Sequence, residues 1–409
     1  MDQFFNNLYF IIIHNQDLLP YIYPKFNIKT INQNNNLNLM ELQFSEEQIL
    51  LRNTVEKLCI DFSDLNTLRE IEDTPKGFSD NFWSQLISLG LTGINIPEKF
   101  GGSEMGLLDQ TILYEEFGKA LSLSPHFISS IISVALIKNL GTKKQQEDIL
   151  PEIASGQLIT SIAWLERGSS FYKNGINFQL SKKGNSIYAN GTKDMVPYAS
   201  VADKLILLYK NDNDINAVII DTDQPGITLN YQENHAKTSL YEVIFDNVEI
   251  DPLNMIESNK FWNIWQNISS ISQILISAEA SGGSERSLFL GRDYSLEREA
   301  FGQKIGTFQS IAHYLADGFV EVESNKLLTY QAAWSFDQNM DILSLSALAK
   351  LQACKSFREI SATTIQIFGG MGFTTEADPQ LFFKRAKHLQ NYLWDEPYLE
   401  MQIEENFFK

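Results

Sequence analysis

The sequence is poor in cysteine, in basic residues and in long apolar runs, and each shortage excludes a class of protein. The two cysteines, Cys59 and Cys354, lie far apart and fit no disulfide or metal-ligand spacing, so we expect a reducing compartment, the cytoplasm. The sequence has 32 basic and 51 acidic side chains, and the net charge of −19 argues against nucleic acid and anionic membranes as partners. No run of 18 apolar residues is present, so no membrane-spanning helix is predicted.

The histidines also lack the pattern of a metal site. The five of them are scattered, with no ligand spacing and no carboxylate or cysteine pattern nearby, at positions His14, His126, His235, His313 and His388. We therefore predict no metal site.

Residues 1–39 differ in composition from the rest of the chain. The apolar patch from Leu8 to Ile13 lacks the basic segment and the small-residue cleavage site of a signal peptide. A transit peptide is rich in arginine, and no arginine precedes Arg52. Amides fill most of residues 32–38. We expect an irregular or disordered extension, or an upstream start that is not part of the mature protein.

The next 118 residues, 40–157, carry helical signals. Ser45 and Gln48 have the spacing of a capping box, which predicts a helix that begins there. Further helices are predicted at 80–89, 108–119, 127–139 and 143–154. These residues are expected to form an N-terminal helical domain.

The hydrophobic period then changes to that of strands over residues 158–255. Asn190-Gly191 predicts a hairpin turn, and β-rich runs follow at 204–209, 217–220, 227–229 and 241–250. Such short strands predict a small central β-barrel or sandwich. In residues 256–409 the helical period returns, with long helices predicted at 271–296, 308–337, 341–368 and 380–407. The expected fold is α+β, and its last domain is a four-helix bundle.

Two stretches of the predicted bundle have the composition of a ligand site. Gln366-Ile-Phe-Gly-Gly-Met-Gly-Phe-Thr-Thr-Glu376 ends a helix with glycines that allow close approach of a ligand, although a plain glycine C-cap explains them equally well. Arg298-Glu-Ala-Phe-Gly-Gln-Lys-Ile-Gly-Thr-Phe-Gln309 places a guanidinium, which suits a pyrophosphate, before Phe301, which suits a flavin or purine face.

Together these two stretches resemble the acyl-CoA dehydrogenase family, whose signature contains Arg-x-x-Phe-Gly-x-x-Ile-x-x-Phe-Gln and, downstream, Gln-x-x-Gly-Gly-x-Gly-Phe-Thr. Ile96-Pro-Glu-Lys-Phe-Gly-Gly102 and Glu115-Glu-Phe-Gly-Lys-Ala120 resemble the helical domain of the same family. The resemblance implies FAD as cofactor. It also implies seven residues that contact FAD, four of them from the neighbouring subunit: Arg298, Gln366, Gly369 and Gly370, and then Phe301, Phe308 and Gln309.

The other half of the flavin site departs from the family pattern. Where the family has Thr-Glu-Pro-x-x-Gly-Ser-Asp, this chain reads Ala163-Trp-Leu-Glu-Arg-Gly-Ser-Ser170, so Leu165 replaces the threonine and Glu166 is retained. The Trp-Ile-Thr contact falls on Met195, Val196 and Pro197. These residues, and the runs Gly372-Phe-Thr-Thr-Glu-x-Asp378 and Lys384-Arg-Ala-Lys387, resemble a divergent branch that acts on branched, cyclic or steroid side-chain acyl-CoA.

The catalytic base is the second departure. Family chemistry needs a carboxylate to take the α-proton, and most members have it in Tyr-Glu-Gly-Thr, where this chain reads Tyr392-Leu-Trp-Asp-Glu-Pro397. Alignment with the divergent branch implies Asp395, with Glu396 beside it, and the alternative is a solvated acidic turn. The other base position of the family falls near Ser272 and holds no carboxylate. Glu279 is expected to be a helix-face residue, and the alternative is that it approaches the acyl pocket.

Two functions follow from this resemblance. The first is an FAD-dependent acyl-CoA dehydrogenase that forms an α,β double bond in an acyl-CoA and passes electrons to an electron-transfer flavoprotein or a similar acceptor. The second is a non-catalytic partner subunit of a hetero-oligomer, because the Arg298 side of the flavin site is kept better than the Leu165 side. A homodimer or homotetramer is expected for the enzyme.

Overall fold

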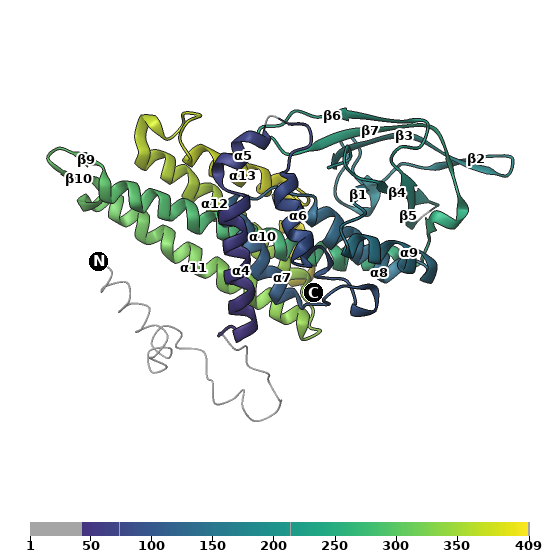
Figure 1. Cartoon of the computed structure of the whole chain (residues 1–409), viewed down its shortest axis with the longest axis horizontal. Coiled ribbons are helices and arrows are strands. Elements are labelled where there is room, and N and C mark those ends of the chain that lie inside the picture. Colours follow the sequence, from purple (N-terminus) through teal and green to yellow (C-terminus); the bar gives the residue numbers. More distant parts are fainter. Residues whose placement is uncertain (1–42, 73, 213, 408–409) are drawn as a thin grey trace, which may run out of the picture. The chain divides into compact units, whose positions relative to one another are not determined.

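The computed structural model describes residues 43–72, 74–212 and 214–407, and the predicted extension at 1–39 lies outside them. From Phe44 onward the chain forms one compact unit, shown in Figure 1. The predicted capping box is confirmed, because Gln48 N donates to Ser45 Oγ and Ser45 N donates to Gln48 Oε1. The helix that begins there is α4.

The first part of the unit is helical, as predicted. Its elements are α4 (Glu46–Phe62), α5 (Leu65–Glu72), α6 (Asp80–Ser88), η1 (Leu91–Gly93), η2 (Glu98–Phe100), α7 (Leu107–Ala120), η3 (Phe127–Ser133), α8 (Val134–Leu140) and α9 (Lys143–Ala154). The helix predicted at 127–139 is π-helical in its first half, η3. A π-helical segment is often found at a functional site, and η3 lines the cavity described below.

The middle part consists of two four-stranded sheets. The strands are β1 (Thr160–Ala163), β2 (Leu180–Lys183), β3 (Ser186–Pro197), β4 (Lys204–Asn211), β5 (Asp214–Asp221), β6 (Ile227–Tyr231), β7 (Leu240–Ile250) and β8 (Met255–Ile256), with η4 (Lys173–Gly175) and η5 (Pro252–Asn254) between them. One sheet has the order β1-β4-β5-β8 and the other β2-β3-β7-β6. Within the described residues they form a sandwich and not a closed barrel. The apolar side chains buried between the sheets include Leu205, Val243 and Phe245.

The predicted hairpin turn at Asn190-Gly191 is wrong. Strand β3 runs through both residues, and its register with β7 shifts between Ala189 and Gly191, which is a β-bulge. A Cβ on Gly191 would lie 2.7 Å from the ring of Phe178, so the glycine provides room for that ring. The turn lies earlier, at Gly184 and Asn185, between β2 and β3.

The last part contains the predicted bundle. Its elements are α10 (Phe261–Glu297), β9 (Glu299–Ala300), β10 (Gln303–Lys304), η6 (Ile305–Thr307), α11 (Gln309–Asp337), α12 (Leu343–Phe368), η7 (Gly369–Met371), α13 (Pro379–Asn391) and α14 (Glu396–Phe407). Helix α10 begins ten residues before the predicted start, and the fourth predicted helix is split into α13 and α14. The split occurs because Leu393 (φ 46°) and Trp394 (φ 67°) adopt the left-handed conformation.

Helix α10 connects the three parts of the unit. It packs against α7 of the N-terminal helices, α12 of the bundle and β5 of the sandwich. Both cysteines are free and buried. None of the helices in the described part of the chain is long and apolar enough to cross a membrane.

Candidate active site

The residues predicted to contact the far part of FAD lie together at one end of the bundle. Arg298 follows the last residue of α10, and its backbone N–H donates to Tyr294 O at 2.8 Å. Phe368 ends α12, and its ring stacks on that of Tyr294 with centroids 4.0 Å apart. This contact brings the Arg298 stretch and the Gln366 to Gly370 stretch side by side.

This end of the bundle is open to a ligand. Arg298 is exposed, and the nearby ion pairs join other residues, Arg292 to Asp293 and Lys304 to Glu299. A Cβ on Gly369 or Gly370 would meet no atom within 4 Å. The predicted helix end at Gly369 is confirmed by its φ of 64°, which favours glycine.

The aromatic and amide residues of the same stretches are also accessible. Phe301 lies between β9 and β10 with 96% of its surface exposed, and its ring centroid is 6.2 Å from that of Phe308. Gln309, the first residue of α11, is exposed, and so is Gln366. These side chains are available to contact a ring system or a phosphate.

The other predicted flavin contacts lie in the sandwich and are mostly buried. Leu165 is buried after β1, and its carbonyl accepts from Asp194 N at 2.8 Å. Val196 is fully buried, Pro197 ends β3, and Met195 is 44% exposed with a φ of 49°. This half of the predicted site therefore offers apolar side chains in place of hydroxyls.

Glu166 is engaged within the protein. Its Oε1 accepts from Lys193 Nζ and from Phe178 N, both at 2.9 Å. Lys193 is fully buried, and burial lowers its pKa to about 8, against the opposing effect of Glu166. The carboxylate of Glu166 thus joins the loop after β1 to the backbone before β2 and to Lys193 of β3.

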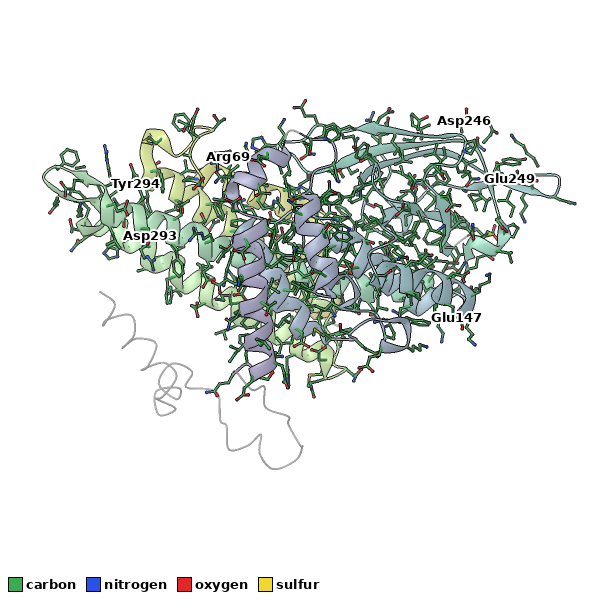
Figure 2. All side chains as sticks on the ribbon, in the orientation of Figure 1. Arg69, Glu147, Asp246, Glu249, Asp293 and Tyr294 are labelled. Carbon is green, nitrogen blue, oxygen red and sulfur yellow. The ribbon has the colours of Figure 1, made fainter. Side chains whose placement is uncertain are left out.

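The two predicted halves of the flavin site are far apart within this chain. Figure 1 shows the β9–β10 hairpin at one end of the bundle and the sandwich strands at the opposite side of the unit. Figure 2 labels Tyr294 at the hairpin end of α10 and labels Asp246 and Glu249, on β7, on the sandwich side. One copy of the chain does not bring the halves together.

A cavity of about 60 Å³, which we call the central cavity, lies where the three parts of the unit meet. Helix α7 and residues 122–128 form one wall, Pro197, Tyr198 and residues 238–240 of the sandwich form a second, and α10 with α13 forms the third. Neither Asp395 nor Glu396 lines it. The carboxylate in its wall belongs to Glu279 of α10.

Glu279 forms an ion pair across the central cavity with Arg385 of α13. The Nη1 of Arg385 lies 3.2 Å from Oε1 of Glu279, and its Nη2 donates to Leu121 O at 3.3 Å. Burial raises the pKa of Glu279, and the guanidinium opposes this rise. That Glu279 could approach the acyl pocket stays a prediction, and the structure places its side chain in the wall of this cavity.

Two histidines beside the ion pair are neutral. His126 Nε2 lies 2.9 Å from Leu91 O, so this nitrogen carries the proton, and Nδ1 accepts from the Tyr114 hydroxyl at 2.8 Å. Burial lowers the pKa of His126 to about 4 and that of His388 to about 3. Neither histidine belongs to a metal-binding cluster in the described residues.

A second cavity, about 10 Å³ in volume and here called the tryptophan cavity, adjoins the central one. The two share Ile128 and Pro197 in their walls. The other lining residues are apolar: Ile132, Ile162, Trp164, Leu165, Met195, Trp265, Leu393 and Trp394. Three of the residues predicted to contact the flavin, Leu165, Met195 and Pro197, therefore lie beside the space that Glu279 and Arg385 line.

The three tryptophans of this cavity form one cluster. The ring centroids of Trp164 lie 5.0 Å from Trp265 and 5.6 Å from Trp394. All three indole N–H groups are buried and have no acceptor among the described residues. A buried donor without a protein partner needs an acceptor from another source, such as a water molecule or a ligand.

Asp395 directly precedes α14, and Glu396 is the first residue of that helix. Asp395 Oδ1 accepts from Tyr398 N at 3.2 Å, the geometry of a helix N-cap, and Glu396 is exposed and accepts from Gln390. The structure thus places the predicted base at a helix end, outside the walls of both cavities.

Sequence reasoning missed Tyr198 and the tryptophan cluster as site residues, and it named Arg385 only as a cation for a polyanionic ligand. The run Lys384-Arg-Ala-Lys387 marked the place of Arg385 but not its direction. A signal was available for Glu279, a charge between Ala278 and Ala280 on a helix whose neighbouring turns are apolar. No signal in the sequence joins Trp164, Trp265 and Trp394.

Comparison with known proteins confirms the resemblance. The acyl-CoA dehydrogenase N-terminal domain model matches residues 45–157, and the acyl-CoA dehydrogenase C-terminal domain model matches residues 262–393. Together they cover more than half of the chain, which therefore belongs to the acyl-CoA dehydrogenase family, a family of oxidoreductases. Membership indicates FAD as the cofactor.

Individual relatives are distant. Acryloyl-CoA reductase (NADH) of Anaerotignum propionicum is 27% identical over 86% of this chain and 92% of its own. The caffeyl-CoA reductase-Etf complex subunit CarC of Acetobacterium woodii is 27% identical over 85% of this chain and 94% of its own. Butyryl-CoA dehydrogenase from Megasphaera elsdenii shares the fold, with a TM-score of 0.82 and 23% identity over 90% of this chain and 100% of its own.

The residues of this chain fit FAD at both predicted halves. The open glycines and Arg298, which has no ion-pair partner among the described residues, suit the pyrophosphate end, and the buried indole donors suit an acceptor-bearing ring. The sandwich side lacks the family's threonine at Leu165 and has Trp394 close by. The fit is therefore better at the Arg298 half, because the sandwich half offers apolar side chains in place of the family's hydroxyls.

Proposed function

We propose that this chain is an FAD-dependent acyl-CoA dehydrogenase that forms an α,β double bond in an acyl-CoA thioester. One observation carries the proposal: the central cavity, which holds a carboxylate and a guanidinium, meets the apolar wall of Leu165, Met195 and Pro197 through shared residues. An acyl group in the central cavity would lie next to the place predicted for the flavin ring.

The roles of the residues follow from this placement. FAD, when bound, supplies the acceptor for the hydride that leaves the β carbon. Arg298, Gln366, Gly369 and Gly370 would bind the pyrophosphate end, and a carboxylate of this chain would take the α-proton. The electrons would then pass to a flavoprotein acceptor. This step is supported by one relative, which is named as a subunit of a reductase-Etf complex.

We also propose that two copies of the chain complete each site. Arg298 precedes the β9–β10 hairpin and Leu165 follows β1. These elements lie at opposite sides of the unit (Figure 1), so we infer that different subunits provide the two halves to one FAD. A homodimer or homotetramer satisfies this requirement, and so does a hetero-oligomer.

The second candidate function is a non-catalytic partner subunit. It is favoured by Leu393, which follows Tyr392 where most members of the family have the catalytic Glu, and which is 7% exposed in the wall of the tryptophan cavity. In that case the chain would provide the Arg298 half of a flavin site to a different subunit.

The absorbance spectrum of the purified protein separates the two functions, because it reports bound flavin directly. We expect flavin bands, and we expect them to bleach when straight, branched or cyclic acyl-CoA is added without oxygen. A flavin-loaded protein that no acyl-CoA bleaches, or a protein that binds no flavin alone, would favour the partner subunit.

The role of Asp395 is tested by two substitutions. Asn is as good an N-cap as Asp but takes no proton, so Asp395→Asn should leave stability nearly unchanged and reduce turnover by several powers of ten if Asp395 is the base. Asp395→Ala should also destabilise the fold by about 1 kcal/mol through the lost cap. Near wild-type turnover by the double variant Asp395→Asn with Glu396→Gln would exclude both residues as the catalytic base. Glu279 would then be the remaining candidate, as the carboxylate in the cavity wall.

A further inference from the structure

The central cavity has a polar wall. Glu279 and Arg385 line it, and their side chains are 13% and 7% exposed. Arg385 donates to Oε1 of Glu279, and no group among the described residues donates to Oε2. Oε2 can therefore accept a hydrogen bond from a ligand. The cavity therefore has an open acceptor beside a guanidinium donor.

Tyrosine and histidine side chains extend this polar wall. The Tyr114 hydroxyl donates to His126 Nδ1, and the Tyr198 hydroxyl accepts from the backbone N–H of Ser124. Tyr392 and His388 also line the cavity, and their rings stack with centroids 4.6 Å apart. Neither the Tyr392 hydroxyl nor the His388 ring has a hydrogen-bond partner among the described residues.

The charges of the cavity wall cancel. One carboxylate faces one guanidinium, and both histidines are neutral because burial lowers their pKa values to about 3 and 4. A charged group on the ligand would therefore enter without an unpaired counter-ion. A neutral group that both donates and accepts matches what the wall offers.

A purely hydrocarbon group would be a poor occupant. It would exclude water from Glu279 Oε2 and from the Tyr392 hydroxyl and leave these half-buried polar groups without partners, which is unfavourable. The volume of about 60 Å³ is several times the ~10–15 Å³ that a single water requires, so it suits a short acyl group.

We propose that the acyl group bound in the central cavity is short and carries a hydroxyl or carbonyl oxygen near its end, which Glu279, Arg385 and Tyr392 recognise. The proposal rests on the proposed function, since it takes the ligand to be an acyl-CoA thioester. It goes further by assigning these three residues to the choice of substrate, through hydrogen bonds to the acyl oxygen.

The test compares matched thioesters by isothermal titration calorimetry on the purified protein. The pairs are butyryl-CoA with 4-hydroxybutyryl-CoA, and valeryl-CoA with 5-hydroxyvaleryl-CoA, and free CoA serves as reference. We expect at least one hydroxylated thioester to bind about tenfold more tightly than its hydrocarbon match. Equal or weaker binding of both hydroxylated thioesters would overturn the proposal and leave the proposed function intact.

Binding of every thioester no tighter than that of CoA would overturn the proposed function and, with it, the present proposal. The two failures are thus distinguishable in one experiment, without any need for turnover.

A double variant locates the preference. Glu279→Leu with Arg385→Met removes both charges without leaving one unpaired, and should reduce the preference for the hydroxyl to about onefold. The matched control removes an exposed pair on the sandwich, Lys173→Met with Asp214→Leu, whose atoms are 2.7 Å apart, and should keep the preference. Should the cavity variant fail to fold, Tyr392→Phe provides the same test, with a smaller expected loss of about threefold. An unchanged preference in Tyr392→Phe and in the double variant would assign recognition elsewhere and overturn the proposal.

Discussion

At the scale of single residues, burial decides the chemistry of the cavity wall. His126 illustrates this, because its hydrogen-bond partners within the described part of the chain are an acceptor, Leu91 O, and a hydroxyl that donates to it. A second proton on the ring would have no acceptor unless Tyr114 turned its hydroxyl. The low pKa of His126 therefore means that protonation of this ring destabilises the folded state.

We expect His126 to make the fold sensitive to acid. Its pKa is 6.5 ordinarily and about 4 in the fold, so between these values the unfolded chain binds the proton and the folded one does not. Stability from this group is present above pH 6.5 and is lost as the pH falls toward 4, by about 3 kcal/mol in total. Urea unfolding of His126→Gln should show a smaller loss between pH 6.5 and 4 than the wild type.

The exposed His235 provides the control for this measurement. His235→Gln should lose stability over the same pH range as the wild type does. An equal pH dependence in His126→Gln and the wild type would show that other groups cause the acid sensitivity.

At the scale of elements, the end of α13 and the start of α14 shape the tryptophan cavity. Lys350 of α12 is fully buried, and its Nζ donates to Trp394 O at 2.8 Å and to Leu389 O at 3.2 Å. These bonds hold the left-handed turn at Leu393 and Trp394 against its conformational cost. The turn directs Trp394 toward Trp164 and ends the helix that the sequence predicts as continuous.

Helices α7 and α10 approach each other so closely that only glycine fits between them. A Cβ on Gly118 would lie 1.9 Å from the carbonyl oxygen of Glu279. We expect Gly118→Ala to reduce the free energy of unfolding by about 3 kcal/mol, because the helices must separate, and this outweighs the better helix propensity of alanine. Denaturant unfolding measures the loss.

Gly370→Ala is the matched control for stability, since a Cβ there meets nothing within 4 Å. It should unfold at nearly the wild-type denaturant concentration. If Gly118→Ala were as stable as Gly370→Ala, the close contact of α7 with α10 would not be rigid.

At the scale of the whole molecule, the proposed shared flavin site would make assembly a condition of cofactor binding. We expect a dimer or larger oligomer in light scattering, and flavin loss when the Arg298 side is damaged. Arg298→Ala should lower the ratio of flavin to protein, and Arg298→Lys should be intermediate because it keeps the charge and loses the bidentate fork.

Arg292→Ala is the control, because Arg292 lies on the same end of α10 and is paired with Asp293. It should keep its flavin. Full flavin content in Arg298→Ala, or a flavin-replete monomer, would contradict the shared site.

The sequence by itself determined the features that depend on neighbouring residues. The capping box at Ser45, the helix end at Gly369 and the motifs around Arg298 and Gln366 act over a few positions, so their patterns predicted helix ends and the family correctly. The predicted domain limits at 157 and 255 rest on the same local changes of period; the second falls inside β8, which pairs with β5.

Only the tertiary structure decided which distant residues meet. Asn190-Gly191 reads as a turn, but pairing of β3 with β7 makes it a bulge. Glu279 and Arg385 are 106 positions apart, and their ion pair exists because α10 and α13 face the same cavity. Contacts of this kind depend on how helices pack, and packing is a property of all the side chains between them, which local patterns do not record.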